Sequence, residues 1–160
     1  MERENTAKIK GMDLPISTKH SIELCNLIRY KTLQQAKKQL NLIYEQKKAL
    51  PLRRFHKDRG HRKGKIGPGA YPIKATKEII KLLNGLEANA QNKGLNTNSL
   101  VLVLVKANMA SRPMRYGRQR GIRAKRTHIE IIAEEKIQEK FKTQEKKEQT
   151  TKEKSKETKK

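Results

Sequence analysis

The chain has 160 residues and a formal net charge of +23 at pH 7, because 39 Lys and Arg are set against only 16 Asp and Glu. This excess repels itself in a compact fold and calls for a polyanionic partner, for which nucleic acid is the first candidate and an anionic membrane surface the second. The length leaves room for one domain, and no stretch is apolar enough for a transmembrane helix or a secretory signal. The single Cys25 excludes an internal disulfide and suits a reducing compartment, cytosolic or nuclear.

The chain opens with a weak strand signal, followed by two clearer helical ones. Residues 7–12 alternate in polarity, which predicts a short strand. Over residues 17–30 the apolar side chains share one helical face, which predicts a first helix. Thr32 then begins a second helix, because Gln35 three residues later completes a capping box. Apolar residues recur at helical spacing throughout residues 32–48, which gives the length of this second helix.

Residues 51–71 form a predicted insertion without regular structure. They show neither helical nor strand periodicity, and an irregular segment of this length in a compact domain is usually functional or disordered. A third helix follows, with Pro72 suited to its first position. Its apolar stripe runs from Ile79 to Ala90, and Gly94 is a natural C-terminal cap.

Residues 99–105 give the clearest strand signal. They are apolar on both faces, which predicts a strand at the centre of a sheet, and residues 127–133 are the natural antiparallel partner. The segment between them is far longer than the two to five residues that a hairpin loop needs. With about ten residues in each arm at roughly 3.3 Å per residue, a hairpin over residues 107–126 would project about 30 Å.

We expect one domain over residues 1–134 and a tail over residues 135–160. The tail contains ten Lys, six Glu and no Arg, and its few apolar side chains cannot bury enough surface to fold alone. The domain therefore carries two long excursions, the insertion (residues 51–71) and the hairpin (residues 107–126).

Arginine is concentrated in these two excursions. Residues 53–65 and 112–126 each hold seven Lys and Arg, so together they carry ten of the twelve Arg and thirteen of the 23 net charges. Arg grips phosphate through a planar fork and stacks on bases, whereas Lys is a hydrated point charge suited to solvent. Interleaved aromatic and His rings can stack on unpaired bases. This segregation predicts segments that bind RNA.

The predicted RNA-binding residues carry a positive charge or a ring and lie mostly in the excursions. They are Lys19, His20, Arg53, Arg54, Phe55, His56, Lys57, Arg59, His61, Arg62, Lys63, Lys65, Arg112, Arg115, Tyr116, Arg118, Arg120, Arg123, Lys125 and Arg126. Alone, a basic run is as compatible with a solvated face or a localisation signal as with a binding site. Two Arg-dense segments in one small domain favour binding. A membrane surface fits less well, because no helix pairs a basic face with a bulky aromatic one.

The sequence does not predict an enzyme, a metal site or a cofactor. No nucleophile with a base, phosphate-binding loop or carboxylate pair can be drawn from it. His56 and His61 lie in a strongly basic segment without Cys, and its charge opposes a cation. Cys25 is predicted to be a core thiol, and His20 and His128 to be structural or to face phosphate.

Four segments of the chain resemble the ribosomal protein L-twenty-two family of the large subunit. They cover about residues 5–135 and read DLPISTKHSIELCNLIRYKTLQQAKKQL, RRFHKDRGHRKGKIGPGAYPIKATKEIIKLL, EANAQNKGL and RTHIEIIAEE. The insertion favours the archaeal and eukaryotic branch, in which the eukaryotic member is called L-seventeen.

The resemblance implies an α+β fold of three helices packed on a small three-stranded antiparallel sheet, with a long protruding β-hairpin. It implies that the hairpin passes through ribosomal RNA to the wall of the nascent-peptide exit tunnel, with Met114, Arg115, Tyr116 and Gly117 as tunnel-facing candidates. The insertion would lie between RNA helices.

The expected function is that of a structural constituent of the large subunit, which supports its assembly and translation. The expected partners are large-subunit ribosomal RNA, neighbouring large-subunit proteins and the nascent polypeptide, on cytoplasmic ribosomes. Two alternatives remain open: a free-standing nucleic-acid binder, such as a chromatin or RNA-chaperone protein, and, less favoured, an enzyme that acts on RNA.

Overall fold

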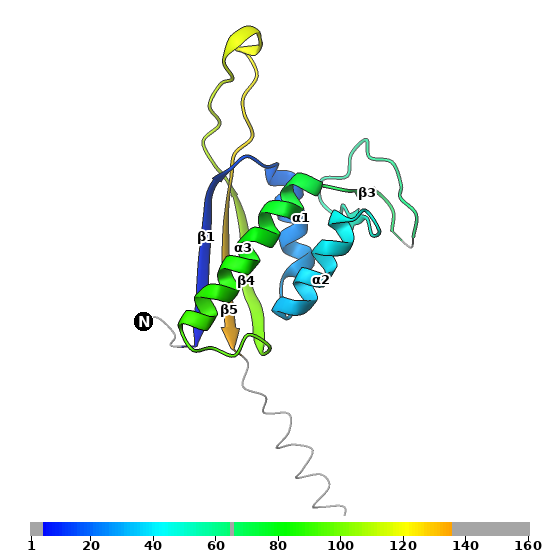
Figure 1. Ribbon diagram of the computed structural model, residues 1–160. Helices are drawn as coiled ribbons and strands as arrows, with labels where there is room; N and C mark the ends of the chain where they lie inside the picture. The colour runs from blue at the N-terminus through cyan, green and yellow to red at the C-terminus, as the bar shows by residue number, and fades with distance from the viewer. Residues whose placement is uncertain (1–4, 65, 136–160) are drawn as a thin grey trace, which may run out of the picture.

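The computed structural model describes residues 5–64 and 66–135, and within these residues three helices lie against a three-stranded antiparallel sheet (Figure 1). The helices are α1 (Thr18–Ile28), α2 (Leu33–Tyr44) and α3 (Ile73–Asn92). The strands of the sheet are β1 (Thr6–Leu14), β4 (Leu100–Met109) and β5 (Thr127–Glu135). The α+β class, with three helices and a small antiparallel sheet, is confirmed.

The hydrophobic core lies between the helices and one face of the sheet. Helix α1 packs on β4, α3 packs on β1, and α2 packs on α3. Side chains from the helices and from the sheet are fully buried in this core, among them Leu24, Leu40, Leu83, Leu102 and Ile131. Burial of one such side chain contributes roughly 1.5–3 kcal/mol relative to exposure. No helix in the described part of the chain is long and apolar enough to cross a bilayer.

Strand β4 lies at an edge of the sheet, because the strand order is β1-β5-β4. The prediction that residues 99–105 are the central strand is therefore wrong. The outer edge of β4 is covered by the turn between α1 and α2, where the Tyr30 N–H donates to the Leu102 carbonyl at 2.8 Å and the Leu102 N–H donates to the Lys31 carbonyl at 3.0 Å. An edge that is covered in this way is protected like a central strand and can be as apolar.

Two glycines allow α3 to approach β1 closely. A Cβ atom on Gly85 would lie 2.8 Å from the Ile9 side chain, and one on Gly11 would lie 2.9 Å from the Leu82 side chain. Gly85 lowers helix propensity in the middle of α3, yet the helix runs through it without a break, as predicted. The close contact with β1 is the physical reason for a glycine at this position.

The helix ends follow local signals, with small corrections. The Thr32 hydroxyl accepts the Gln35 N–H at 3.4 Å, as predicted for the start of α2, but the helix ends at Tyr44 and not near residue 48. Helix α3 begins one residue after Pro72, which is its N-terminal cap and not its first helical residue. Gly94 follows the helix with a φ of +72°, a conformation that glycine adopts without strain.

The insertion, predicted to lack regular structure, has a short paired base. Strands β2 (Leu50–Pro51) and β3 (Gly69–Ala70) are antiparallel and bring its two ends together. Further out, a single bridge joins His61 to Pro68. The insertion is therefore an irregular hairpin that is fixed to the domain at both ends.

The hairpin continues β4 and β5 beyond the body of the domain. Regular pairing ends where Met109 faces Thr127, and one further bridge joins Met114 to Arg123. A single 3-10 turn, η1 (Gly117–Gln119), lies at the tip. Figure 1 shows the hairpin, in yellow, rising past the ends of the strands and helices. Its side chains near the tip thus have little of the domain to contact.

Candidate nucleic-acid interface

The base of the hairpin, the insertion and the first turn of α1 meet around a pocket of about 590 Å³, which we call the insertion-side pocket. Its lining consists of polar and basic side chains around one aromatic ring: Ser17, Thr18, Lys19, His20, Arg54, Phe55, Lys57, Arg59, Arg112 and Lys125. The structure thus brings together predicted RNA-binding residues from three segments that are distant in the sequence.

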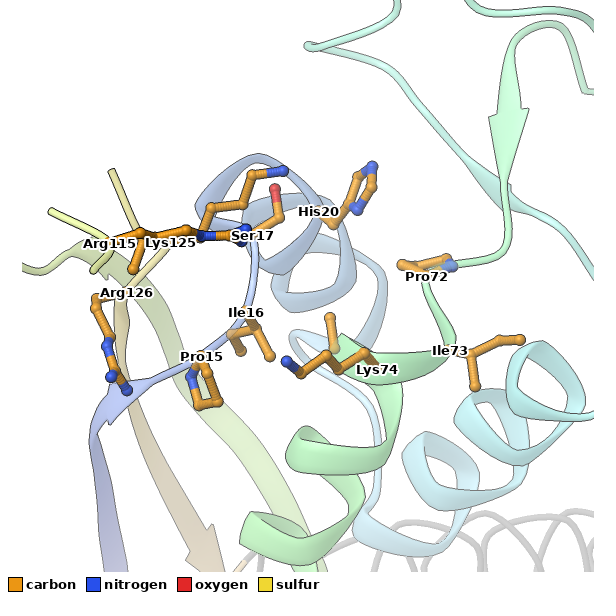
Figure 2. A pocket seen from close by; sticks show the side chains of 12 residues that line it. Pro15, Ile16, Ser17, His20, Pro72, Ile73, Lys74, Arg115, Lys125 and Arg126 are labelled. Atoms are coloured by element: carbon orange, nitrogen blue, oxygen red, sulfur yellow. The ribbon is translucent and has the colours of Figure 1, made fainter. Parts of the chain in front are cut away.

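A second pocket, of about 440 Å³, adjoins the first and shares Ser17, His20 and Lys125 with it (Figure 2). We call it the α3-side pocket, because the first residues of α3 form part of its wall. Its other lining residues come from the end of β1, from α3 and from the hairpin: Pro15, Ile16, Pro72, Ile73, Lys74, Ala75, Arg115, Ala124 and Arg126. The two pockets together are called the basic groove.

His20 lies where the two pockets join, and its surroundings are strongly positive. Partial burial lowers the pKa of His20 below its usual value of 6.5, and the charges of Arg59 and Lys125 lower this pKa further. Arg59 belongs to the insertion and Lys125 to the hairpin, so both excursions place positive charge near this ring. Such a site opposes the gain of a further proton and favours an anion.

A buried carboxylate fastens the insertion to α1. Glu23 is 3% exposed, and its Oε1 atom accepts the backbone N–H groups of Arg54 at 2.6 Å and of Phe55 at 3.3 Å. The Phe55 ring is half-buried, with Lys19 Nζ 5.8 Å and the Arg54 guanidinium 5.4 Å from its centroid. These contacts fix the first residues of the insertion beside the groove.

The rest of the insertion presents its cations to solvent. The predicted contacts Arg53, His56, Lys57, Arg59, His61, Arg62 and Lys63 are all exposed. His56 Nδ1 lies 3.0 Å from the Arg53 carbonyl, and the Arg62 guanidinium lies 5.5 Å from the centre of the Tyr71 ring. Lys65, also predicted to contact RNA, lies outside the described residues.

The hairpin is exposed along most of its length. The predicted contacts Arg112, Arg115, Arg118, Arg120, Arg123 and Lys125 are exposed, and no carboxylate among the described residues pairs with them. Tyr116 is 97% exposed and Met114 is 59% exposed. Arg115 and Lys125 line the basic groove, whereas Tyr116 and Arg118 line neither of its pockets. The hairpin therefore lines the groove with side chains from both of its arms, as far along as Arg115, and carries Tyr116 and Arg118 outside the groove.

Two of the singled-out residues have contacts within the domain. The Arg126 guanidinium donates to the Asp13 carbonyl at 3.0 Å, so it stabilises the base of the hairpin as well as lining the groove. His128 Nδ1 accepts the Asp13 N–H at 3.1 Å. His128 is thus structural, which is one of the two roles predicted for it.

Neither a metal-ligand cluster nor an exposed thiol is found among the described residues. They contain no group of three or more His, Cys, Asp or Glu side chains that could hold a metal ion. Cys25 is 1% exposed, and burial raises the pKa of its thiol to about 12. This thiol stays protonated and packs in the core, as predicted.

Two residues of the interface did not follow from sequence reasoning. Glu23 is the single acid of α1, but nothing in the sequence pointed to its partners in the insertion. Lys74 lines the groove from the first turn of α3. A cation in the first turn of a helix opposes the helix dipole, and this local conflict was the available signal for an anionic partner.

A comparison with protein families and a comparison with individual proteins point to the same family. Residues 9–134 match the family described as "Ribosomal protein L22p/L17e". The chain is 39% identical to "Large ribosomal subunit protein uL22" of Thermofilum pendens, over 84% of this chain and 93% of that protein. It is 42% identical to the protein of the same name from Nanoarchaeum equitans, over 82% and 80%, and 38% identical to that from Archaeoglobus fulgidus, over 83% and 90%.

Proposed function

The chain belongs to the ribosomal protein L22p/L17e family, and from this membership we propose that it is a structural constituent of the large ribosomal subunit that binds ribosomal RNA. The relatives are named as proteins of that subunit. The proposed action is non-catalytic: the protein holds RNA segments together, supports assembly of the subunit and thereby supports translation. Its place of action would be the cytoplasmic ribosome.

The structural observation that supports the RNA-binding part of this proposal is the convergence of both Arg-rich excursions on one end of a small core. The insertion and the hairpin are separated by α3 and β4 in the sequence, yet Arg59 and Lys125 both lie beside His20. Cations held this close repel one another unless a polyanion neutralises them. Phosphate contacts by Arg and Lys would position the RNA, and its shape would do most of the selecting.

The hairpin tip is proposed to reach the wall of the nascent-peptide exit tunnel. Met114, Arg115, Tyr116 and Gly117 are all exposed, and the hairpin extends past the body of the domain (Figure 1). Met114 and Tyr116 stand exposed at the end of this projection, where their side chains are free to contact other molecules. The nascent polypeptide and neighbouring large-subunit proteins would then be partners as well as RNA.

Within the domain of residues 1–134, the core of helices and sheet would lie on the surface of the subunit, and the two excursions would reach inward. The insertion would lie between RNA helices, since its cations face solvent and its base is held by Glu23. The predicted tail, residues 135–160, lies outside the described residues except for Glu135, and the proposal assigns it no RNA contact.

Sedimentation tests the proposal against a free-standing nucleic-acid binder. Lysate from cells that express the tagged full-length chain is sedimented, and the large-subunit fraction is then washed with high salt. We expect the chain to stay with the subunits, because contacts buried within assembled RNA exchange slowly. Release at modest salt would favour a chromatin or chaperone protein held by surface phosphate contacts alone. Turnover of labelled RNA by the purified chain would contradict the non-enzymatic function.

A further inference from the structure

The basic groove has a charge pattern that the domain itself does not neutralise. Nine Lys and Arg line its two pockets, and no Asp or Glu of the described residues lies in either lining. The nine cations come from α1, the insertion, α3 and the hairpin: Lys19, Arg54, Lys57, Arg59, Lys74, Arg112, Arg115, Lys125 and Arg126. A concave surface lined by one sign of charge concentrates anions.

Both helices that reach the groove begin there. Each has a basic residue in its first turn, where acidic residues are favoured. The second residue of α1 is Lys19 and the second residue of α3 is Lys74. Neither helix has an acidic residue in its first turn or a side-chain cap. The N-terminus of a helix carries about half a positive charge, so a Lys in the first turn is unfavourable without an anion nearby. The same local conflict at two helix ends in one groove indicates a shared anionic ligand.

The size and position of the pockets narrow the form of this ligand. Volumes of about 440 and 590 Å³ fall within the range of roughly 300–1,000 Å³ that holds a small organic ligand. Each pocket therefore has room for about one nucleotide and not for a turn of duplex. Because the pockets join at Ser17, His20 and Lys125, a continuous chain of nucleotides can occupy both.

We propose that the basic groove binds the sugar–phosphate backbone of a single RNA strand, with one phosphate at the start of α1 and another at the start of α3. This inference rests on the proposed RNA-binding function and goes beyond it by assigning one binding site and the form of its ligand. It adds Lys74 to the RNA contacts. The bound strand fastens the insertion to the hairpin, because its phosphates neutralise Arg59 and Lys125, which line the same pocket.

The test compares two lysines of the same helix. Lys74 lines the groove, whereas Lys77, also exposed on α3, lines neither pocket. The affinity of the full-length chain for a short oligouridylate is measured by fluorescence anisotropy over a series of salt concentrations. Loss of one phosphate contact to a single strand lowers the slope of log affinity against log salt by about 0.7. Lys74→Gln is expected to lower the slope by this amount and Lys77→Gln to leave it unchanged.

A second pair makes the result independent of any one variant. Lys125→Gln is expected to behave like Lys74→Gln, and Lys38→Gln, an exposed residue of α2, like Lys77→Gln. Equal slopes for all four variants would overturn the proposed binding of RNA in the groove. A change of slope of the same size for Lys74→Gln with duplex RNA would overturn it as well. Vesicles of phosphatidylserine and phosphatidylcholine test for a lipid ligand, and binding that depends on Lys74 there but not with oligouridylate would also overturn it. If the chain sediments with large subunits while Lys74→Gln leaves the slope unchanged, the assignment of this groove is wrong and the proposed function still holds.

Discussion

The carboxylate of Glu23 accepts the backbone N–H of Arg54 at 2.6 Å, and this contact connects the middle of α1 to the start of the insertion. The same oxygen accepts the Phe55 N–H at 3.3 Å. The like charges of the insertion repel one another, so its position beside the groove depends on a few anchoring contacts with the domain. Glu23 supplies one of them from within the core.

Replacement of Glu23 by Ala should destabilise the domain by about 2 kcal/mol, because hydrogen bonds to a buried charged group are worth roughly 1.5–3 kcal/mol. Urea unfolding measures the change in the free energy of unfolding. Glu78→Ala is the control, since its salt bridge with Lys81 is at the surface and worth less than about 1 kcal/mol. Equal losses for the two variants would contradict the anchoring role of Glu23.

Hydrogen exchange in the isolated protein should separate the base of the insertion from its outer part. We expect slow exchange at the Arg54 amide, which Glu23 holds, and fast exchange over most of residues 53–70 and 108–125, where few apolar contacts oppose opening. Amide exchange followed by NMR on the full-length chain gives both rates. Uniformly slow exchange in the two excursions without RNA would show that the protein alone orders them.

The arginines of the hairpin should matter more than an equal charge elsewhere. Simultaneous replacement of Arg118, Arg120 and Arg123 by Ala is expected to weaken incorporation into large subunits more than replacement of three lysines from residues 135–160. The reason is that Arg binds phosphate bidentately and stacks on bases, whereas Lys acts as a point charge. Quantitation of the tagged chain in the subunit fraction measures incorporation, and equal losses would mean that charge alone decides.

Tyr116 should contribute to RNA binding and not to folding. Its side chain is 97% exposed, so Tyr116→Ala is expected to leave the urea midpoint unchanged. Stacking on an unpaired base is worth about 1–3 kcal/mol, and affinity for a short oligouridylate should fall by a corresponding factor. Tyr44→Ala on α2 is the control for loss of an exposed ring. Unchanged affinity would contradict an RNA contact by Tyr116.

The stability of the isolated domain should fall at acidic pH because of His20. Its pKa is lowered in the folded state by burial and by Arg59 and Lys125, relative to the usual value of 6.5. A group of this kind contributes stability above pH 6.5 that is lost as the pH falls through the lower, folded-state pKa. Urea unfolding at a series of pH values should show this loss, and His20→Asn should reduce it. His61→Asn, an exposed residue of the insertion, should retain the loss.

Much of the fold follows from local patterns in the sequence. The helical stripe after Thr32, the side-chain bond from Thr32 to the Gln35 amide and the strand over residues 127–133 were all predictable, because each depends on neighbours within a few positions along the chain. The concentration of Arg in two segments is likewise visible in the sequence alone, and it is the basis for the prediction of an RNA partner.

Other features depend on which distant segments meet, and these only the tertiary structure decided. The sequence shows that residues 99–105 are apolar on both faces, but not that the turn at Tyr30 and Lys31 covers their outer edge in place of a strand. Nor does it show that Glu23 faces Arg54, or that Lys74 joins Lys125 in one groove. Periodicity and charge are local properties of the sequence, so they predict most of the helices and strands and indicate a class of partner. The edge strand, the anchor and the groove arise from contacts between residues that are far apart in the chain.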